Sequence, residues 1–356
     1  MKRLLTAMLT IALAFHLLPL VAAQSQQSPR LAVALGADVK LVEPFGIDFD
    51  AAGNAYLVEL SGGRLLRVDA SDKVHIVAGA LKEKGDEGDG GPAAKARFNG
   101  LHNLAIDRSG DIYLADTLNR KVRKIDGKTN VVSTIAGTGK AGYSGDGGPA
   151  TKATFGGIYC VALAPQGDKL YLADLDNRRI RVVDLASGIV DLVAGNGEKG
   201  KPTDGVDAKT SPLVDPRAVA ADANGNVYIL ERGGNALRVV DRSGAIRTVV
   251  GASGKAGKTG DGSDAREAML NGPKHLCIDG ESNVIIADAE NNLVRKYIPT
   301  TGTIVRVAGN GKRGTAGIGG PPDQAELARP HGVRVRADGM LYIVDSYNDR
   351  VVRIEK

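Results

Sequence analysis

The chain has 356 residues, 46 Lys and Arg against 41 Asp and Glu, a formal charge of +5, two cysteines and no tryptophan. This small positive excess gives little support to a nucleic-acid partner. Two cysteines are too few for a disulfide-framed fold, so a hydrophobic core must hold the protein together.

The chain begins with an apolar run over residues 4–20, which follows two basic residues and ends in Val21-Ala22-Ala23. This order is typical of a secretory signal peptide. We therefore expect cleavage of residues 1–23 and a mature protein that is periplasmic or extracellular. No later segment approaches the ~20 apolar residues of a membrane span, so no stable membrane anchor is expected.

The rest of the chain is a repeat. An apolar group that ends in an acidic residue recurs every 57 or 58 positions, with its first residue at Tyr56, Tyr113, Tyr171, Tyr228, Ile285 and Tyr342. Each unit alternates like four short strands and is followed by a Gly-rich connector. Such small units cannot bury both faces alone, so we predict an all-β, six-bladed propeller over residues 24–356.

The two ends of the chain are expected to share one blade. The last unit stops at Lys356 after only three strands, and residues 31–36, LAVALG, have the pattern of the missing fourth strand. We predict that this N-terminal strand completes the final blade and removes two exposed sheet edges.

The repeat resembles the NHL family over essentially all of the mature chain. The signature is carried by residues such as Ile106, Asp107, Gly110, Tyr113, Asp116, Asn119 and Arg123. The resemblance implies a six-bladed propeller but no single activity, because NHL propellers include binding scaffolds, RNA-binding domains, lyases and relatives of lactonases. The Gly-rich connector is similar to that of secreted bacterial NHL proteins.

The period also aligns the residue at the start of each first strand, which we call the mouth ring: Phe45, His102, Tyr159, Arg217, Lys274 and His331. First strands line the channel of a propeller, so we predict that these side chains meet at one mouth. Polar groups of this kind are costly to bury without partners. We interpret the ring as a ligand site, and the alternative is a water-filled electrostatic lining.

Each ring residue is expected to lie near a carboxylate at the end of the second strand, from Glu59, Asp116, Asp174, Glu231, Asp288 and Asp345. Pairs of His102 with Asp116, Arg217 with Glu231, Lys274 with Asp288 and His331 with Asp345 follow from this placement. The alternative is a structural role, because asparagine follows four of these acids by three residues. Glu59 and Glu231 instead precede Gly-Gly, and we include them among the candidate ligand-binding residues.

Metal sites are an alternative. The architecture is similar to that of the peptidyl-hydroxyglycine amidating lyase, and this resemblance implies zinc at His102 and His331. Arg217 stands where the third ligand is expected, and strand alternation turns His275 away from the side that Lys274 faces. The acids of the connectors suggest calcium, or more simply turns: Asp86, Asp89, Asp146, Asp204, Asp207, Asp261 and Asp264.

Two functions therefore stay open. The first is an exported, monomeric scaffold that binds an anionic small molecule, glycan or protein at the mouth ring, with the connectors as walls. The second is a lyase or hydrolase that uses a histidine as general base and a cation as oxyanion donor, with the catalytic set His102, His331, Arg217, Lys274 and Tyr159. Cys160 and Cys277 fall in first strands two blades apart and are expected to be buried free thiols.

Overall fold

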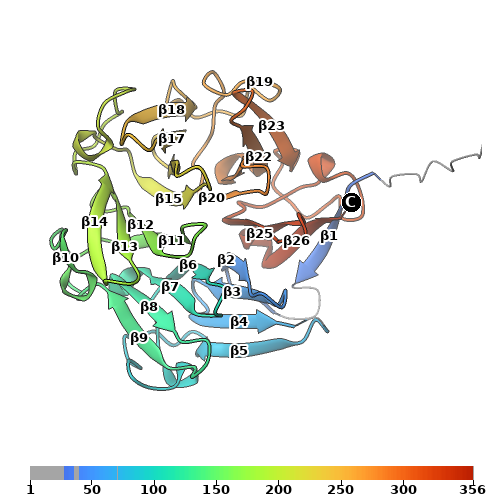
Figure 1. Ribbon diagram of the computed structural model, residues 1–356. Helices are drawn as coiled ribbons and strands as arrows, with labels where there is room; N and C mark the ends of the chain where they lie inside the picture. Colours follow the sequence, from blue (N-terminus) through green and yellow to red (C-terminus); the bar gives the residue numbers. More distant parts are fainter. Residues whose placement is uncertain (1–27, 36–39, 70, 356) are drawn as a thin grey trace, which may run out of the picture.

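The repeats fold into six antiparallel sheets around a central channel, as the computed structural model shows (Figure 1). The structure describes residues 28–35, 40–69 and 71–355. The predicted signal peptide lies outside these residues. Each sheet is one blade whose first strand lines the channel, so the predicted all-β propeller is confirmed. No helix in the described ranges is long and apolar enough to cross a membrane.

The first three blades follow the chain in order. Blade one contains β2 (Pro44–Phe49), β3 (Ala55–Glu59), β4 (Arg64–Val68) and β5 (Val74–Gly79). Blade two contains β6 (Leu101–Ile106), β7 (Ile112–Asp116), β8 (Lys121–Ile125) and β9 (Val132–Ala136). Blade three contains β11 (Ile158–Leu163), β12 (Lys169–Asp174), β13 (Arg179–Asp184) and β14 (Ile189–Ala194), with the short β10 (Gly148–Pro149) added outside β14.

The last three blades continue around the ring. Blade four contains β15 (Pro216–Ala221), β16 (Val227–Glu231), β17 (Ala236–Val240) and β18 (Ile246–Val250). Blade five contains β20 (His275–Ile278), β21 (Val284–Asp288), β22 (Leu293–Ile298) and β23 (Thr303–Ala308), with β19 (Ser263–Asp264) outside β23. Blade six contains β24 (Gly332–Val335), β25 (Leu341–Asp345), β26 (Arg350–Glu355) and β1 (Arg30–Leu35).

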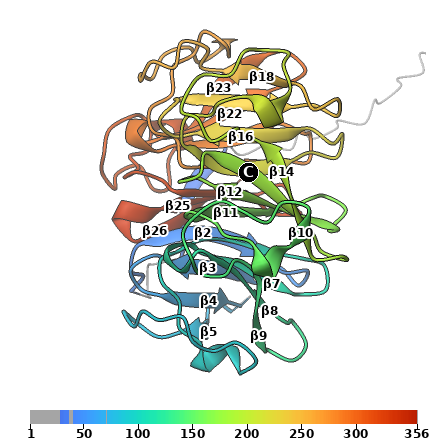
Figure 2. The ribbon, with the colours of Figure 1, turned by 90° about the vertical axis from the view of Figure 1, so that its left-hand side faces the viewer.

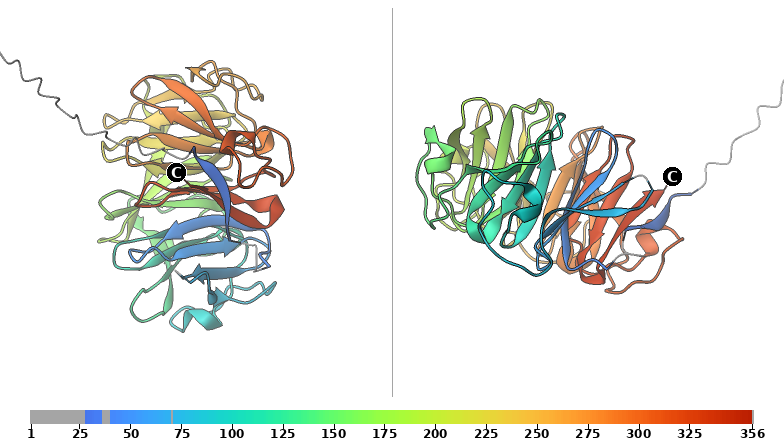
Figure 3. Two further views of the ribbon diagram at one scale, coloured as in Figure 1. Left: turned by 90° about the vertical axis from the view of Figure 1, so that its right-hand side faces the viewer. Right: turned by 90° about the horizontal axis from the view of Figure 1, so that it is seen from below.

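The N-terminal strand closes the ring. β1 pairs antiparallel with β26, so that the two ends of the described chain lie side by side (Figure 3). Leu31 is fully buried and packs into the same core cluster as Val352. The predicted closure is confirmed, and the end of the predicted strand at Gly36 lies outside the described residues.

The connectors cross from the outer strand of one blade to the inner strand of the next, and the sheets succeed one another around the ring in side view (Figure 2). Single turns of 3-10 helix occur in four connectors: η1 (Ala93–Lys95), η3 (Ala150–Lys152), η4 (Ala208–Thr210) and η6 (Pro322–Gln324). Three more follow second strands: η2 (Thr117–Asn119), η5 (Ala289–Asn291) and η7 (Ser346–Asn348). A Cβ on Gly145 would lie 2.8 Å from the Cα of Ala153, so the connector needs glycine where its backbone folds back on itself.

Both cysteines are buried free thiols, as predicted. Cys160 lies on β11 and Cys277 on β20. Burial raises the pKa of the Cys160 thiol to about 11 and that of the Cys277 thiol to about 12. Both therefore stay protonated at neutral pH and contribute packing rather than thiolate chemistry.

Candidate functional site

The structure brings the mouth ring together. The Phe45 ring stacks on that of His331 at a centroid distance of 4.0 Å and meets the edge of His102 at 5.3 Å. His102 lies 4.6 Å from Tyr159, and the guanidinium of Arg217 covers the face of Tyr159 at 4.4 Å. Five of the six residues thus form one continuous chain of contacts across the channel.

Backbone bulges place these side chains. In blades one to four the register shifts at the ring residue, so that the first strand carries an extra residue opposite the second strand. In blade five the backbone N–H of Lys274 bonds the carbonyl of Ala287, which also pairs with His275. A bulge breaks the alternation of a strand and re-aims its side chains. The His275 side chain reaches Asn103 across the channel at 3.0 Å, so the expectation that alternation would turn His275 away is wrong.

The carboxylates that end the second strands bind the connectors instead of the ring. All six are without exposed surface. Asp116 accepts a hydrogen bond from the Asn99 backbone N–H at 2.8 Å, and the same bond recurs in the other blades from the backbone N–H of Val42, Gly156, Val214, Asn271 and Ala328. The asparagine three residues after the acid supplies a second donor in four blades.

The four predicted pairs between ring residues and these carboxylates are therefore absent from the described structure. The Nδ1 atom of His102 instead bonds the Gly100 carbonyl at 3.0 Å, and that of His331 bonds the Arg329 carbonyl at 3.0 Å. Lys274 pairs with Glu290 at 3.4 Å. A carboxylate beside each histidine would have supported general-base catalysis, and no carboxylate of the described residues contacts His102 or His331.

An arginine on the third strand, buried or nearly so, pairs with each carboxylate or with an acid of the neighbouring connector. Glu59 and Glu231, which we included as candidate ligand-binding residues, contact Arg64 and Arg238 at 2.6 Å. In three other blades the arginine also reaches a connector acid, in the pairs Arg123–Asp89, Arg181–Asp146 and Arg295–Asp261. Five of the seven connector acids that were expected to bind calcium or form turns pair with an arginine, because Asp86 also contacts Arg123 and Asp204 contacts Arg266. No group of three or more His, Cys, Asp or Glu in the described part of the chain could hold a metal.

Arg217 differs from these arginines because it has no acid. Its residue is 6% exposed, it makes no ion pair within the described ranges, and its Nε atom has no hydrogen-bond acceptor. Burial above all, with a smaller contribution from the charge of Arg232, lowers the pKa of Arg217 to about 10. A charged side chain buried without a partner carries a desolvation cost that a ligand anion can offset.

The charge of Arg217 helps to lower the pKa of three neighbouring ring residues, Lys274, His102 and His331. Burial and then Arg217 lower the pKa of Lys274 to about 8. Burial, followed by the charges of Arg217 and Lys274, keeps the pKa of His102 and of His331 well below the usual range. Both histidines are therefore neutral at pH 7, and with Nδ1 donating to a carbonyl each presents Nε2 as an acceptor. The mouth ring is a region of positive potential with two neutral imidazoles.

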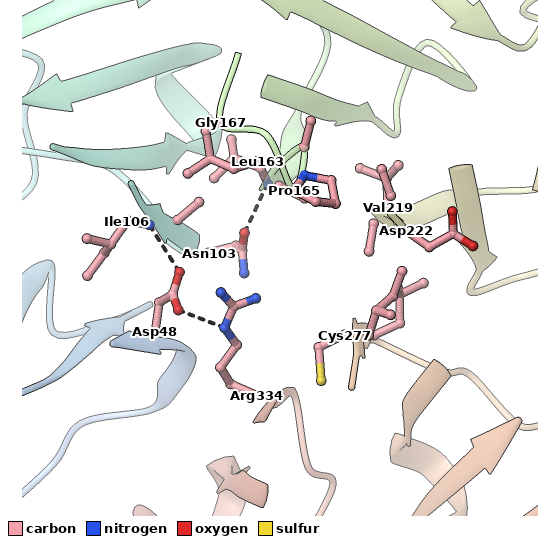
Figure 4. Close-up of a pocket in the computed structure, with 18 of the residues that line it drawn as sticks. Asp48, Asn103, Ile106, Leu163, Pro165, Gly167, Val219, Asp222, Cys277 and Arg334 are labelled. Atoms are coloured by element: carbon pink, nitrogen blue, oxygen red, sulfur yellow. Dashed lines mark hydrogen bonds and ion pairs between the residues drawn. The ribbon is translucent and has the colours of Figure 1, made fainter. Parts of the chain in front are cut away.

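A cavity lies at the other end of the first strands, where the sequence predicted no site. It has a volume of about 490 Å³ and is lined by residues from all six blades. Its polar centre is an ion pair between Arg334 on β24 and Asp48 on β2, with the Arg334 Nε 2.7 Å from a carboxylate oxygen (Figure 4). Asp48 and Arg334 stand three positions after their mouth-ring residues, and the other four blades have small residues at this position of the repeat: Ala105, Ala162, Ala220 and Cys277. The two charged residues could therefore have been singled out from the sequence.

Similarity to known proteins is clearest for the repeat. A family model described as the Teneurin NHL domain matches residues 184–259. The chain is 27% identical over 285 residues to the protein Suppressor of Quenching 1, chloroplastic, of Arabidopsis thaliana, which covers 77% of this chain and 27% of that protein. It is 23% identical over 333 residues to NHL repeat-containing protein 2 of Gallus gallus, which covers 85% of this chain and 43% of that protein. The chain spans less than half the length of either relative.

Among solved structures, an auxiliary nutrient binding protein from Bacteroides ovatus superposes with a TM-score of 0.66 at 17% identity, covering 92% of this chain and 76% of that one. At this level of identity the likeness shows the fold alone.

Proposed function

Because this chain belongs to the NHL-repeat propellers, we propose that it is an exported binding protein whose mouth ring holds the anionic group of a small molecule, glycan or protein. The observation that carries the proposal is Arg217, a buried cation with no acid within the described ranges. Lys274 adds a second charge at the same mouth, and the signal-like residues 1–23 motivate the location outside the cytoplasm.

The chemistry of the site favours a carboxylate or a phosphate. A guanidinium presents a planar fork of donors that matches both groups. Lys274 contributes a compact charge, and the free Nε2 atoms of His102 and His331 can accept hydrogen bonds from ligand hydroxyls. An anion that also carries hydroxyl groups would satisfy cations and imidazoles together. The name of the nutrient-binding structural neighbour is consistent with a binding role.

Binding is favoured over lyase or hydrolase chemistry by the partners of the histidines. Neither His102 nor His331 contacts a carboxylate, and the low pKa of each makes it a weak base. A general base usually has a pKa near the working pH. Replacement of both histidines by alanine should change ligand affinity by a modest factor, whereas catalysis would fall by orders of magnitude.

The test is calorimetric titration of the protein with phosphate, succinate, citrate and glucuronate. We expect at least one of these anions to bind with a stoichiometry near one, and Arg217→Met and Lys274→Met each to weaken it at least tenfold. Arg247→Met is the matched control, because Arg247 lies on β18 of the same blade as Arg217 and its side chain is 55% exposed. Equal affinities in wild type, Arg217→Met and Arg247→Met would refute the proposal.

A further inference from the structure

A hydrogen bond across the channel separates the mouth ring from the 490 Å³ cavity. Asn103 of blade two and His275 of blade five follow their ring residues directly, and their side chains meet at 3.0 Å although the blades face each other across the ring. The Asn103 oxygen accepts from the Val161 backbone N–H, so its amide nitrogen is the donor to His275. The two residues form the floor of the cavity.

The cavity is built around one fixed donor group. Asp48 is 3% exposed and accepts hydrogen bonds from the backbone N–H groups of Phe49 and Ile106, which hold its carboxylate in place beside Arg334. Only the Nε edge of Arg334 meets Asp48, and the side chain keeps 43% of its surface accessible. Figure 4 shows the two terminal nitrogens of the guanidinium pointing into the middle of the cavity.

No acceptor in the described chain meets these terminal nitrogens. Guanidinium donors seek acceptors, and a ligand that enters the cavity can supply one. A volume of 490 Å³ falls in the range of small-molecule sites. The wall is small and apolar at the level of Asp48 and Arg334, where alanines occupy three of the six positions and Cys277 a fourth, and both polar and apolar residues line the rest of the cavity. The cavity therefore suits an aliphatic body with a single polar head.

The charge balance selects the kind of head. Asp48 already neutralises Arg334, and the His275 pKa of about 3, lowered by burial, leaves that ring uncharged. The other charged residues that line the cavity are three acids, Asp107, Asp222 and Asp279, and one base, Arg108. Acidic side chains are therefore in excess. A carboxylate head would add a negative charge where acids are in excess, whereas a carbonyl oxygen accepts from Arg334 without doing so.

We propose that this cavity is a second ligand site, distinct from the mouth ring, that binds an uncharged aliphatic carbonyl compound through the terminal guanidinium nitrogens of Arg334. Asp48 is the positioning residue for that guanidinium. The aliphatic chain of the ligand lies against Ala105, Ala162 and Ala220. The Asn103–His275 bond makes the two sites independent, so the channel binds opposite classes of ligand at its two ends: anions at the mouth ring and neutral carbonyl compounds in the cavity.

The test compares hexanamide with hexanoate, which have the same chain and differ in charge, by ligand-observed NMR titration of the full chain. We expect saturable hexanamide binding and at least tenfold weaker hexanoate binding at this site. Ala220→Leu should weaken hexanamide at least tenfold by filling the cavity, and Ala186→Leu, on an exposed turn, should not. Arg334→Lys keeps a charge beside Asp48 but removes the guanidinium fork, and it should weaken hexanamide to a similar degree.

The outcomes separate this proposal from the one for the mouth ring. Arg217→Met should leave hexanamide binding unchanged, because Arg217 lies beyond the Asn103–His275 floor. Hexanoate binding that equals or exceeds that of hexanamide and is lost in Ala220→Leu would show an anion site and overturn the inference about charge. Hexanamide binding that is absent, or that Ala220→Leu leaves unchanged, would overturn the site itself.

Discussion

Replacement of Arg217 by methionine should stabilise the ligand-free protein. Arg217 is 6% exposed and its pKa is lowered by burial from 12.5 to about 10. Below pH 10 the side chain is charged in both the folded and the unfolded chain, so the whole shift opposes folding at neutral pH. At 1.36 kcal/mol per pKa unit the buried charge costs about 3 kcal/mol.

The stacking of Arg217 on Tyr159 offsets part of this cost. A cation over an aromatic ring contributes about 1 kcal/mol, and methionine, a flexible apolar residue, fills a similar space. The net expectation is that Arg217→Met raises the free energy of unfolding by about 2 kcal/mol. The same substitution should abolish the stabilisation of the folded state by a bound anion.

Urea unfolding followed by tyrosine fluorescence measures both effects, because the chain has nine tyrosines and no tryptophan. Wild type and Arg217→Met are compared with and without the anion that binds best. The reasoning is refuted if Arg217→Met is less stable than wild type by more than about 1 kcal/mol, since a loss beyond the Tyr159 contact would mean that the arginine has a stabilising partner.

Three further predictions follow from the same structure. Anion affinity should fall by up to about tenfold between pH 8 and 9, because Lys274, with a pKa of about 8, loses its proton there. In calorimetric titrations, the Lys274→Arg variant should keep a constant affinity over this range. Arg123→Ala should lower the free energy of unfolding by about 3–5 kcal/mol, because Asp116 stays buried without its cation. A loss under about 1 kcal/mol in urea unfolding would show that the hydrogen bonds to Asp116 stabilise its buried charge without the arginine. Deletion of residues 24–35 removes β1 and exposes the edge of β26. The truncated chain should therefore melt at a lower temperature and form oligomers that light scattering detects. An unchanged melting temperature together with a monomer would contradict closure of the ring by β1.

The fold could be predicted from the sequence because its strand pattern recurs at a nearly constant interval. Six occurrences of one strand pattern at 57 or 58 residues defined the blades, and a last unit short of one strand pointed to the N-terminal segment. The same period aligned the mouth ring, and five of its six side chains meet in the structure, since residues at equivalent positions of a propeller share one level of the channel. Phe45 and His331, almost the length of the chain apart, therefore stack as neighbours.

The details of the site depended on geometry that the period does not carry. The side chain of His275 reaches across the channel to Asn103, which simple alternation along the first strand does not predict. The carboxylates were placed near the ring, but their oxygens meet connector amides because those amides point at them in three dimensions. Gly62 shows a finer constraint: a Cβ there would lie 2.2 Å from an oxygen of Glu59, which explains the glycine in a blade where glutamate replaces aspartate.

The cavity was missed because its ion pair joins the first blade to the last. Asp48 and Arg334 are the only residues of their level that are charged, which the repeat alignment displays. Their proximity, however, follows only when closure of the ring brings β2 beside β24. Charged exceptions at a position where the repeat prefers small residues are a signal that sequence analysis can use in other propellers.

The most direct test of the account is the position of a bound anion. Crystals of the protein soaked in selenate, a tetrahedral anion with a strong anomalous signal, would reveal it in an anomalous difference map. We expect a peak within hydrogen-bonding distance of the Arg217 guanidinium and the Lys274 ammonium, and its loss in Arg217→Met. Peaks confined to exposed arginines, with the mouth ring empty, would contradict the claim that this ring binds anions.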